Sequence, residues 1–91
     1  MKKCFKYIIK GRVQGVGFRY FVYENARKYG ICGWVKNKMN GSVEVYAFGN
    51  IDVMDYFEQE LRQGPIYSSV EEVLKSSDSI ELSLTGFSIK N

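Results

Sequence analysis

The chain has 91 residues, of which 45% are hydrophobic and 25% charged, and its formal net charge is +3. This length suits one compact domain around one core, and the composition is globular rather than disordered. We therefore expect residues 1–91 to form a single domain. The mild positive charge suits a small anionic partner better than a nucleic acid, which would favour a denser basic stripe.

The first ten residues are rich in lysine, but Lys6 and Lys10 interrupt the continuous apolar stretch that a signal peptide requires. No segment approaches the length and hydrophobicity of a membrane span. We predict a cytoplasmic, monomeric protein without a membrane partner.

Cys4 and Cys32 are the only cysteines, and the sequence contains no histidine. The two cysteines lack the CxxC or CxxH spacing of zinc sites, so we expect no metal and no cofactor. The absence of histidine excludes a Ser-His-Asp or Cys-His nucleophilic site. Two buried thiols are the favoured interpretation, and a disulfide in an oxidising compartment stays open as an alternative.

The first predicted elements are a strand and a helix. Phe5, Tyr7 and Ile9 alternate with more polar residues, which indicates a strand that ends before Gly11. From residue 18 the period changes to that of a helix, whose predicted end is Gly30. Its apolar face consists of Phe18, Phe21, Val22, Ala26 and Tyr29.

Residues 31–38 and 42–48 are two β-rich runs on either side of Met39-Asn40-Gly41. Asn-Gly readily adopts the positive φ angles of a tight hairpin turn, so these two runs should pair antiparallel.

A second helix should follow, capped by Asn50 and ended by Gly64-Pro65. Its apolar positions are Ile51, Met54, Phe57 and Leu61. Residues 70–74 are a fourth predicted strand, and a last strand is expected within 82–89. The order βαββαβ predicts an α+β, ferredoxin-like sandwich in which two helices cover one face of an antiparallel sheet.

Residues 11–19 connect the first strand to the first helix and read GRVQGVGFR. Glycines let an anion approach main-chain amides, and the amides at a helix N-terminus lack intrahelical partners. Arg19 could add a planar guanidinium to the same anion. The loop is neither a Walker A motif nor a dinucleotide fingerprint. Taken alone, three glycines and an arginine would favour a simple tight turn with a solvated Arg19.

Residues 11–19 match every fixed position of G-R-V-Q-G-V-x-F-R, so this segment resembles the acylphosphatase signature. Gly33-Trp34-Val35-Lys36-Asn37 and Gly41-Ser42-Val43 are similar to the second segment of that family. The resemblance extends over essentially the whole chain.

The resemblance implies an enzyme that hydrolyses the carboxyl-phosphate anhydride of small acyl phosphates to a carboxylate and inorganic phosphate, without a metal. It implies that Arg19 and the loop amides hold the phosphate, and that Asn37 positions the attacking water. The implied amides belong to Gln14, Gly15, Val16, Gly17 and Phe18. Arg19 and Asn37 are thus the expected catalytic residues.

Such chemistry is consistent with a chain that lacks histidine. The leaving carboxylate has a pKa of about 4, so a general acid is unnecessary. Positioning and electrostatic stabilisation can then suffice for phosphoryl transfer. A neutral carboxamide such as Asn37 can orient water beside an anionic phosphate without repelling it, although turn propensity near Asn40-Gly41 is an alternative reason for asparagine there.

Two rival functions remain from the sequence. A ferredoxin-like sheet can bind single-stranded RNA on exposed aromatic side chains, but the RNP1 pattern is absent here. The chain could also be a non-catalytic, anion-binding accessory domain of the kind fused within larger maturation proteins. Because the sequence ends at Asn91 with no appended domain, we expect the free-standing enzyme rather than the accessory domain.

Overall fold

The computed structural model describes residues 1–79 and 85–91. Five strands and two helices follow one another in these ranges. In chain order they are β1 (Lys2–Arg12), α1 (Phe18–Lys28), β2 (Cys32–Asn37), β3 (Val43–Asn50), α2 (Ile51–Gln63), β4 (Ser69–Ser77) and β5 (Phe87–Lys90). The type and order of the predicted elements are therefore confirmed, although β1 continues through Gly11 to Arg12 and β4 extends beyond residues 70–74 on both sides. The early part of the predicted last strand, residues 82–84, lies outside the described residues. Neither of these helices is long and apolar enough to cross a membrane.

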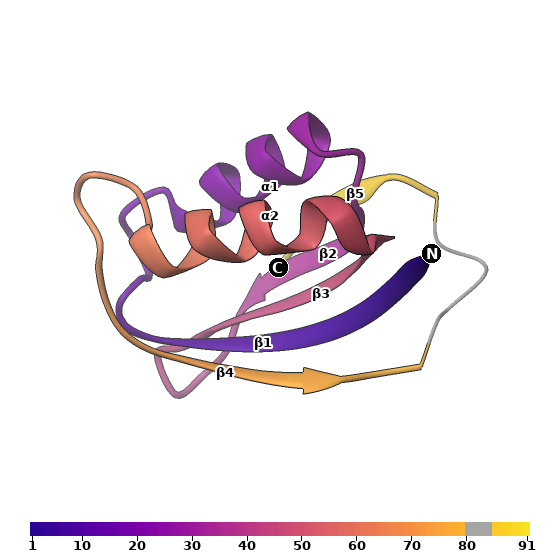
Figure 1. Ribbon diagram of the computed structural model, residues 1–91. Coiled ribbons are helices and arrows are strands. Elements are labelled where there is room, and N and C mark those ends of the chain that lie inside the picture. Colours follow the sequence, from indigo (N-terminus) through magenta and orange to yellow (C-terminus); the bar gives the residue numbers. More distant parts are fainter. Residues whose placement is uncertain (80–84) are drawn as a thin grey trace.

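The sheet has the strand order β4-β1-β3-β2-β5, and both helices lie on one of its faces (Figure 1). This arrangement is the predicted α+β, ferredoxin-like sandwich. Strand β1 pairs antiparallel with β3 and β4, and β2 pairs antiparallel with β3. Strand β5, however, runs parallel to β2. The prediction of a wholly antiparallel sheet is thus corrected to a mixed one, because the chain reverses after β4 and adds β5 at the opposite edge.

The two helices begin differently. Asn50 caps α2, since its side-chain oxygen accepts a hydrogen bond from the amide of Asp52 at 3.0 Å. Helix α1 starts after Gly17, which makes no side-chain cap. Helix α2 ends at Gly64, as the sequence predicted. The amide hydrogens at the start of α1 are consequently left without a capping side chain.

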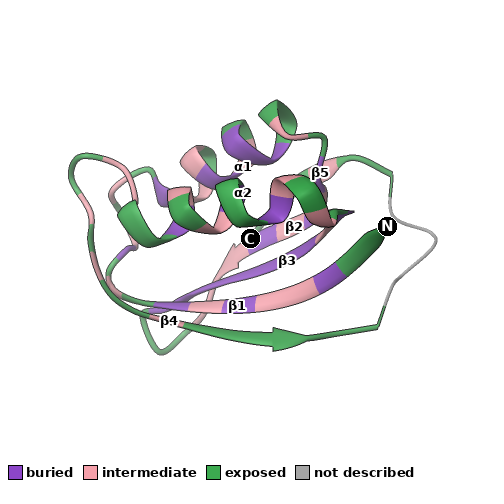
Figure 2. Ribbon diagram, viewed as in Figure 1, coloured by how far each residue is buried: buried purple, intermediate pink, exposed green. Residues whose placement is uncertain are grey.

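The core lies between the sheet and the helices, where the buried residues of both layers meet (Figure 2). Tyr7 and Ile9 of β1 are fully buried, as are Val22 of α1 and Phe57 of α2. The alternation of β1 and the helical spacing of the two apolar faces therefore direct most of the predicted side chains inward. Ile51 is the exception, since this first residue of α2 is half-buried and lies outside the core cluster.

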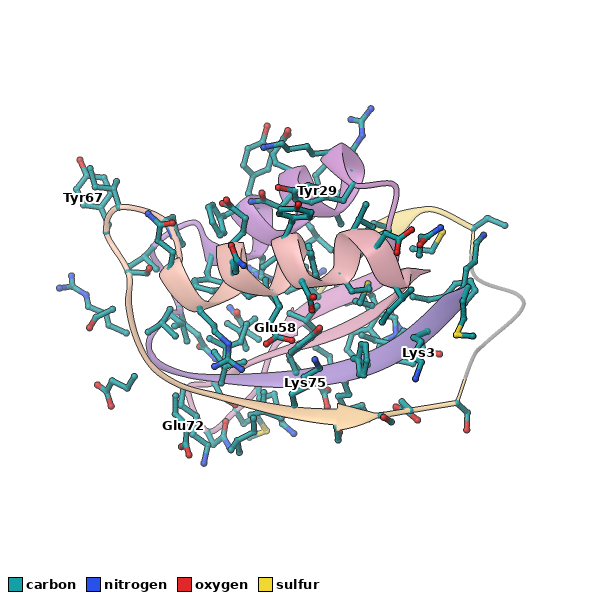
Figure 3. All side chains as sticks on the ribbon, viewed as in Figure 1. Lys3, Tyr29, Glu58, Tyr67, Glu72 and Lys75 are labelled. Carbon is teal, nitrogen blue, oxygen red and sulfur yellow. The ribbon has the colours of Figure 1, made fainter. Side chains whose placement is uncertain are left out.

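Glu58 of α2 connects this helix to β4. Lys75 places its Nζ 2.7 Å from Glu58 Oε1, and the two side chains face each other between helix and strand (Figure 3). Arg62 Nη2 lies 3.1 Å from Glu58 Oε2, and Tyr7 donates a hydrogen bond to Oε1 at 3.4 Å. Burial and the adjacent carboxylate of Glu58 raise the pKa of Tyr7.

Cys4 and Cys32 lie on different strands, and the register places both opposite Phe48 of the intervening β3. Two strand spacings separate their Cα atoms by about 10 Å. A disulfide requires Cα atoms within about 7 Å, so the pairing that the sequence left open is ruled out in this fold.

Candidate active site

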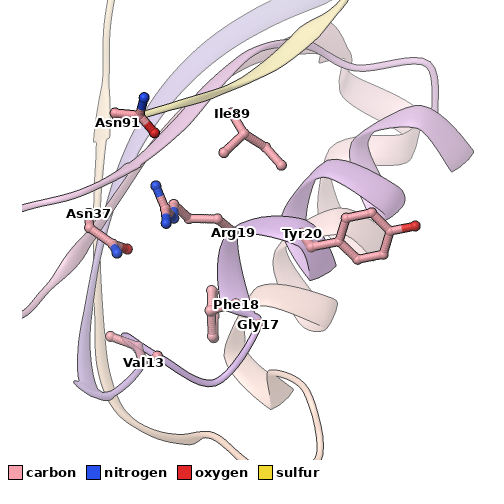
Figure 4. A pocket seen from close by; sticks show the side chains of 9 residues that line it. Val13, Gly17, Phe18, Arg19, Tyr20, Asn37, Ile89 and Asn91 are labelled. Atoms are coloured by element: carbon pink, nitrogen blue, oxygen red, sulfur yellow. The ribbon is translucent and has the colours of Figure 1, made fainter.

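A cavity of about 280 Å³ opens where the loop before α1 meets the ends of β2 and β5 (Figure 4). Four parts of the fold build it: the loop after β1, the first turn of α1 and the last residues of the two parallel strands. Its lining residues are Val13, Gly15, Gly17, Phe18, Arg19, Tyr20, Asn37, Ile89 and Asn91.

Two glycines of the loop that lines this cavity are left-handed. Gly15 has a φ of 73° and Gly17 a φ of 78°, a region that L-residues with side chains rarely adopt. The first intrahelical bond runs from the amide of Phe21 to the carbonyl of Gly17 at 3.1 Å. The amides before Phe21 therefore lack intrahelical partners, and the first turn of α1 contains no acidic residue. This is the local arrangement that binds anions at helix N-termini.

Arg19 extends from the first turn of α1 toward Asn37 and Asn91 (Figure 4). Its Nη1 donates a hydrogen bond to the main-chain carbonyl of Lys90 at 3.0 Å. Strand β5 thus orients the guanidinium, whose remaining donors are available to an anion in the cavity. Arg19 is half-buried, so it is neither a core residue nor a side chain that only solvent contacts.

Asn37 is the last residue of β2 and pairs with Val43 of β3. Strand alternation puts its side chain on the same face of the sheet as Val35, which is the helix-covered face. The hairpin turn follows later, closed by a bond from the Gly41 amide to the Lys38 carbonyl at 3.1 Å. Turn propensity therefore accounts for Asn40 but not for Asn37.

The remaining residues of the predicted loop differ in their placement. Phe18 has a buried ring, so only its main chain can serve an anion. Val16 packs partly against the core. Gln14 is not among the lining residues, and its side chain instead donates to the carbonyls of Lys38 and Ser42. Any contribution of Gln14 and Val16 to anion binding would have to come from their main-chain amides.

Four lining residues were not predicted from the sequence. Val13 lies within the motif and Tyr20 directly follows it, so proximity in sequence could have indicated them. Ile89 and Asn91 come from the end of β5, and no sequence signal places that strand beside β2.

Tyr20 is the lining residue that most resembles a proton donor or acceptor. Hydrogen bonding to Glu24, together with the negative charge of that residue, raises the pKa of Tyr20. Figure 4 shows the Tyr20 hydroxyl directed away from Arg19 and Asn37. A phenol with a raised pKa stays protonated near neutral pH, so Tyr20 is unsuited to be a general base.

The described residues contain no cluster of three or more His, Cys, Asp or Glu side chains that could hold a metal ion. Nor does an Asp or Glu stand among the described residues that line the cavity. Arg19 is therefore the charged side chain that this part of the structure offers to an anion.

The sheet face opposite the helices carries aromatic rings, and lysine ammonium groups lie over the ring of Trp34 on this face. Trp34 stacks on Tyr46 with ring centroids 5.7 Å apart. The ammonium groups of Lys36 and Lys90 lie 5.2 and 4.7 Å from the centre of the Trp34 ring. Tyr46 is only 5% exposed. Among the described residues, these two rings are therefore covered by each other and by lysine side chains rather than open to the stacking of RNA bases.

Comparison with known proteins gives one consistent result. The acylphosphatase family model matches residues 5–89. The chain is 41% identical over 88 residues to an acylphosphatase of Vibrio cholerae serotype O1, covering 97% of both chains. The crystal structure of an acylphosphatase from Bacillus subtilis is 36% identical and covers all of both chains, with a TM-score of 0.93.

A part of a larger protein is similar as well. The crystal structure of full-length HypF in the phosphate- and nucleotide-bound form matches all of this chain with a TM-score of 0.88 and 26% identity, while the match covers 12% of HypF.

The chain belongs to the acylphosphatase family. The resemblance inferred from the two sequence motifs is thereby confirmed.

Proposed function

We propose that this protein hydrolyses small acyl phosphates, with Arg19 and Asn37 as its catalytic residues. One observation carries the proposal: uncapped amides at the start of α1, the guanidinium of Arg19 and the carboxamide of Asn37 line one cavity of about 280 Å³. A phosphoryl group is the ligand that such donors suit best.

In this proposal the amides of Gln14 to Phe18 and the guanidinium of Arg19 bind the phosphoryl oxygens. Asn37 orients a water molecule, using its carbonyl oxygen as acceptor and its amide as donor. Because the carbonyl of Lys90 accepts a hydrogen bond from Arg19, the guanidinium is oriented before substrate arrives.

The reaction then has one chemical step. The water oxygen forms a bond to phosphorus while the bond from phosphorus to the acyl oxygen breaks, and the carboxylate leaves with that electron pair. The proton of the water passes to a phosphoryl oxygen, which yields inorganic phosphate. A carboxylate of pKa about 4 leaves without protonation, so neither a general acid nor a metal is required. The increase of charge on the phosphoryl oxygens is stabilised by the amides and Arg19.

The test is hydrolysis of benzoyl phosphate, followed by ultraviolet absorbance, for the wild type and for Arg19→Ala and Asn37→Ala. Each variant should lose turnover on the order of 10²- to 10³-fold or more, the usual effect of removing one preorganised electrostatic contact. Arg27→Ala is the matched control, because Arg27 lies on the same helix, is exposed and does not line the cavity. Circular dichroism establishes that every variant is folded.

Turnover by the wild type that is lost in both folded variants and kept in Arg27→Ala would support the assignment. A wild type that binds phosphate without hydrolysing benzoyl phosphate would contradict it and favour a non-catalytic accessory domain. Salt-dependent RNA binding without hydrolysis would favour the RNA-binding alternative.

The same proposal includes the setting in which the enzyme works. Residues 1–91 act as one catalytic unit, as a monomer in the cytoplasm, with acyl phosphate and inorganic phosphate as ligands and with neither nucleic acid nor membrane as a partner. The site recognises the phosphoryl group of the substrate rather than its acyl group, because the described polar groups of the cavity are those that would bind a phosphate.

A further inference from the structure

We propose that the side chain of Gln14 is a positioning residue, which sets the distance between the phosphate-binding loop and Asn37. The inference rests on the proposed function. It assigns to Gln14 a role through its carboxamide that is separate from the binding of phosphate by its main-chain amide.

The side chain of Gln14 makes two hydrogen bonds to the hairpin between β2 and β3. Its Nε2 donates to the main-chain carbonyl of Lys38 at 2.7 Å and to that of Ser42 at 2.8 Å. A glutamine amide nitrogen has two hydrogens, so these bonds use its full donor capacity. Both acceptors lie in the hairpin that joins β2 to β3, 24 and 28 residues away in the chain.

Hydrogen bonds within the hairpin fix the two carbonyls that accept from Gln14. The Lys38 amide donates to the Ser42 carbonyl at 2.8 Å. The side-chain oxygen of Asn40 accepts from the amide of Ser42 at 3.1 Å and from its hydroxyl at 2.6 Å. Ser42 is only 4% exposed. The two carbonyls that receive Gln14 are therefore fixed in place by the turn.

Each end of this connection adjoins a part of the proposed machinery. Gln14 directly precedes Gly15, from which the loop runs to the start of α1, and Lys38 directly follows Asn37. The loop contains two left-handed glycines, so its own backbone is poorly constrained in the absence of tertiary bonds. The Gln14 carboxamide supplies such bonds at the point where the loop passes the hairpin.

This placement predicts an effect on turnover rather than on phosphate affinity. The phosphoryl group would be held by loop amides and Arg19, and the water by Asn37, so the reaction depends on the distance between the two sets. A displacement of about 1 Å can reduce a rate about 10²-fold by losing the reactive geometry. Binding of phosphate needs only the first set of groups.

The test uses Gln14→Met, which keeps most of the side-chain volume and removes both donors. We expect kcat for benzoyl phosphate to fall about 10- to 100-fold, while the inhibition constant of inorganic phosphate changes less than about threefold, as expected if phosphate binding is unaffected. Gln14→Glu keeps the shape but can only accept hydrogen bonds when ionised. It should likewise lower kcat and leave the inhibition constant of phosphate nearly unchanged. If Gln14→Met does not fold, Gln14→Asn replaces it, since the shorter amide keeps its donors but does not reach both carbonyls.

The matched control is Asn25→Leu. Asn25 is a buried carboxamide of α1 that donates to the Phe21 carbonyl at 2.9 Å, away from the cavity lining. Both Asn25→Leu and Gln14→Met remove part-buried hydrogen bonds, so each should lose stability, but only Gln14→Met should lose kcat.

Three results would overturn the positioning role. The first is an unchanged kcat in a folded Gln14 variant, and the second is a loss of phosphate affinity as large as the loss of kcat. The third is a loss of kcat in Asn25→Leu equal to that in Gln14→Met, which would trace the effect to stability. A wild type without turnover would instead contradict the proposed function itself.

Discussion

Arg19 and Lys90 are 71 residues apart in the chain, yet the guanidinium of Arg19 donates to the main-chain carbonyl of Lys90 at 3.0 Å. The parallel pairing of β5 with β2, which aligns Lys90 with Lys36, brings that carbonyl to the end of β2 beside the cavity. Strand β5, at the edge of the sheet, thus orients the guanidinium of Arg19 in the first turn of α1.

This relationship predicts that charge alone does not replace Arg19. Arg19→Lys keeps a positive charge but loses the planar fork that can bond Lys90 and a phosphoryl oxygen together. We expect kcat/KM for benzoyl phosphate to fall by about one to two orders of magnitude. Activity of Arg19→Lys close to that of the wild type would show that a point charge is sufficient.

The left-handed Gly17 predicts a cost in stability for a side chain at this position. A methyl group at Gly17 would meet no heavy atom within 4 Å apart from its neighbours in the chain, so the penalty of Gly17→Ala comes from the φ of 78°. We expect the free energy of unfolding to fall by about 1 kcal/mol, because left-handed strain of about 1–2 kcal/mol is partly offset by reduced freedom of the unfolded chain. Gly17→Asn should lose less, since asparagine tolerates this region better. Urea denaturation measures both, and equal stability of all three proteins would contradict the prediction.

Glu58 predicts how stability responds to acid. Burial acts to raise the pKa of Glu58, but the hydrogen bonds from Lys75 and Arg62 outweigh it, and the net shift is downward. A lowered pKa in the folded state stabilises the protein above the unfolded pKa of about 4.3, and this stabilisation is lost as pH falls through the folded value.

We therefore expect the wild type to exceed Glu58→Gln in free energy of unfolding by the most near about pH 6, and by much less near about pH 2. Urea denaturation at a series of pH values gives this comparison. A difference between the two proteins that does not vary with pH would show that Glu58 contributes through packing and not through its charge.

The separation of Cys4 from Cys32 predicts that the protein does not depend on a disulfide between them. Both cysteines lie opposite Phe48, one on each side of β3. The midpoint of thermal unfolding should be the same with and without dithiothreitol. After unfolding without reductant, iodoacetamide should modify both thiols, which mass spectrometry detects. A higher unfolding midpoint without dithiothreitol, together with thiols that iodoacetamide does not modify, would contradict this prediction.

The chemistry of the leaving group predicts that chelators do not inhibit. A carboxylate of pKa about 4 needs no metal to leave, so dialysis against EDTA should leave kcat/KM for benzoyl phosphate unchanged. Activity that EDTA abolishes and a divalent cation restores would require a different mechanism.

Much of this fold could be predicted because the relevant signals are local. The alternation around Tyr7 and the helical spacing around Phe57 each follow from the geometry of one element. Asn50 and Gly64 mark the ends of a helix through bonds and angles within a few residues. The same holds for the candidate loop, since Gly15 and Gly17 adopt the positive φ angles that glycine permits.

Other features depend on which segments meet, and local pattern carries no such information. That β5 runs parallel to β2, and so brings Ile89 and Asn91 to the cavity, follows from the edge of the sheet at which the chain arrives. The orientation of Arg19 by Lys90 and the hold of Gln14 on the hairpin are likewise contacts between distant segments. The sequence was sufficient to name Arg19, Asn37 and the glycine loop as candidates. The contribution of β5 to the cavity, and the distances and orientations of the groups, were decided by tertiary packing, because hydrogen bonds between remote backbones exist only once the sheet is assembled.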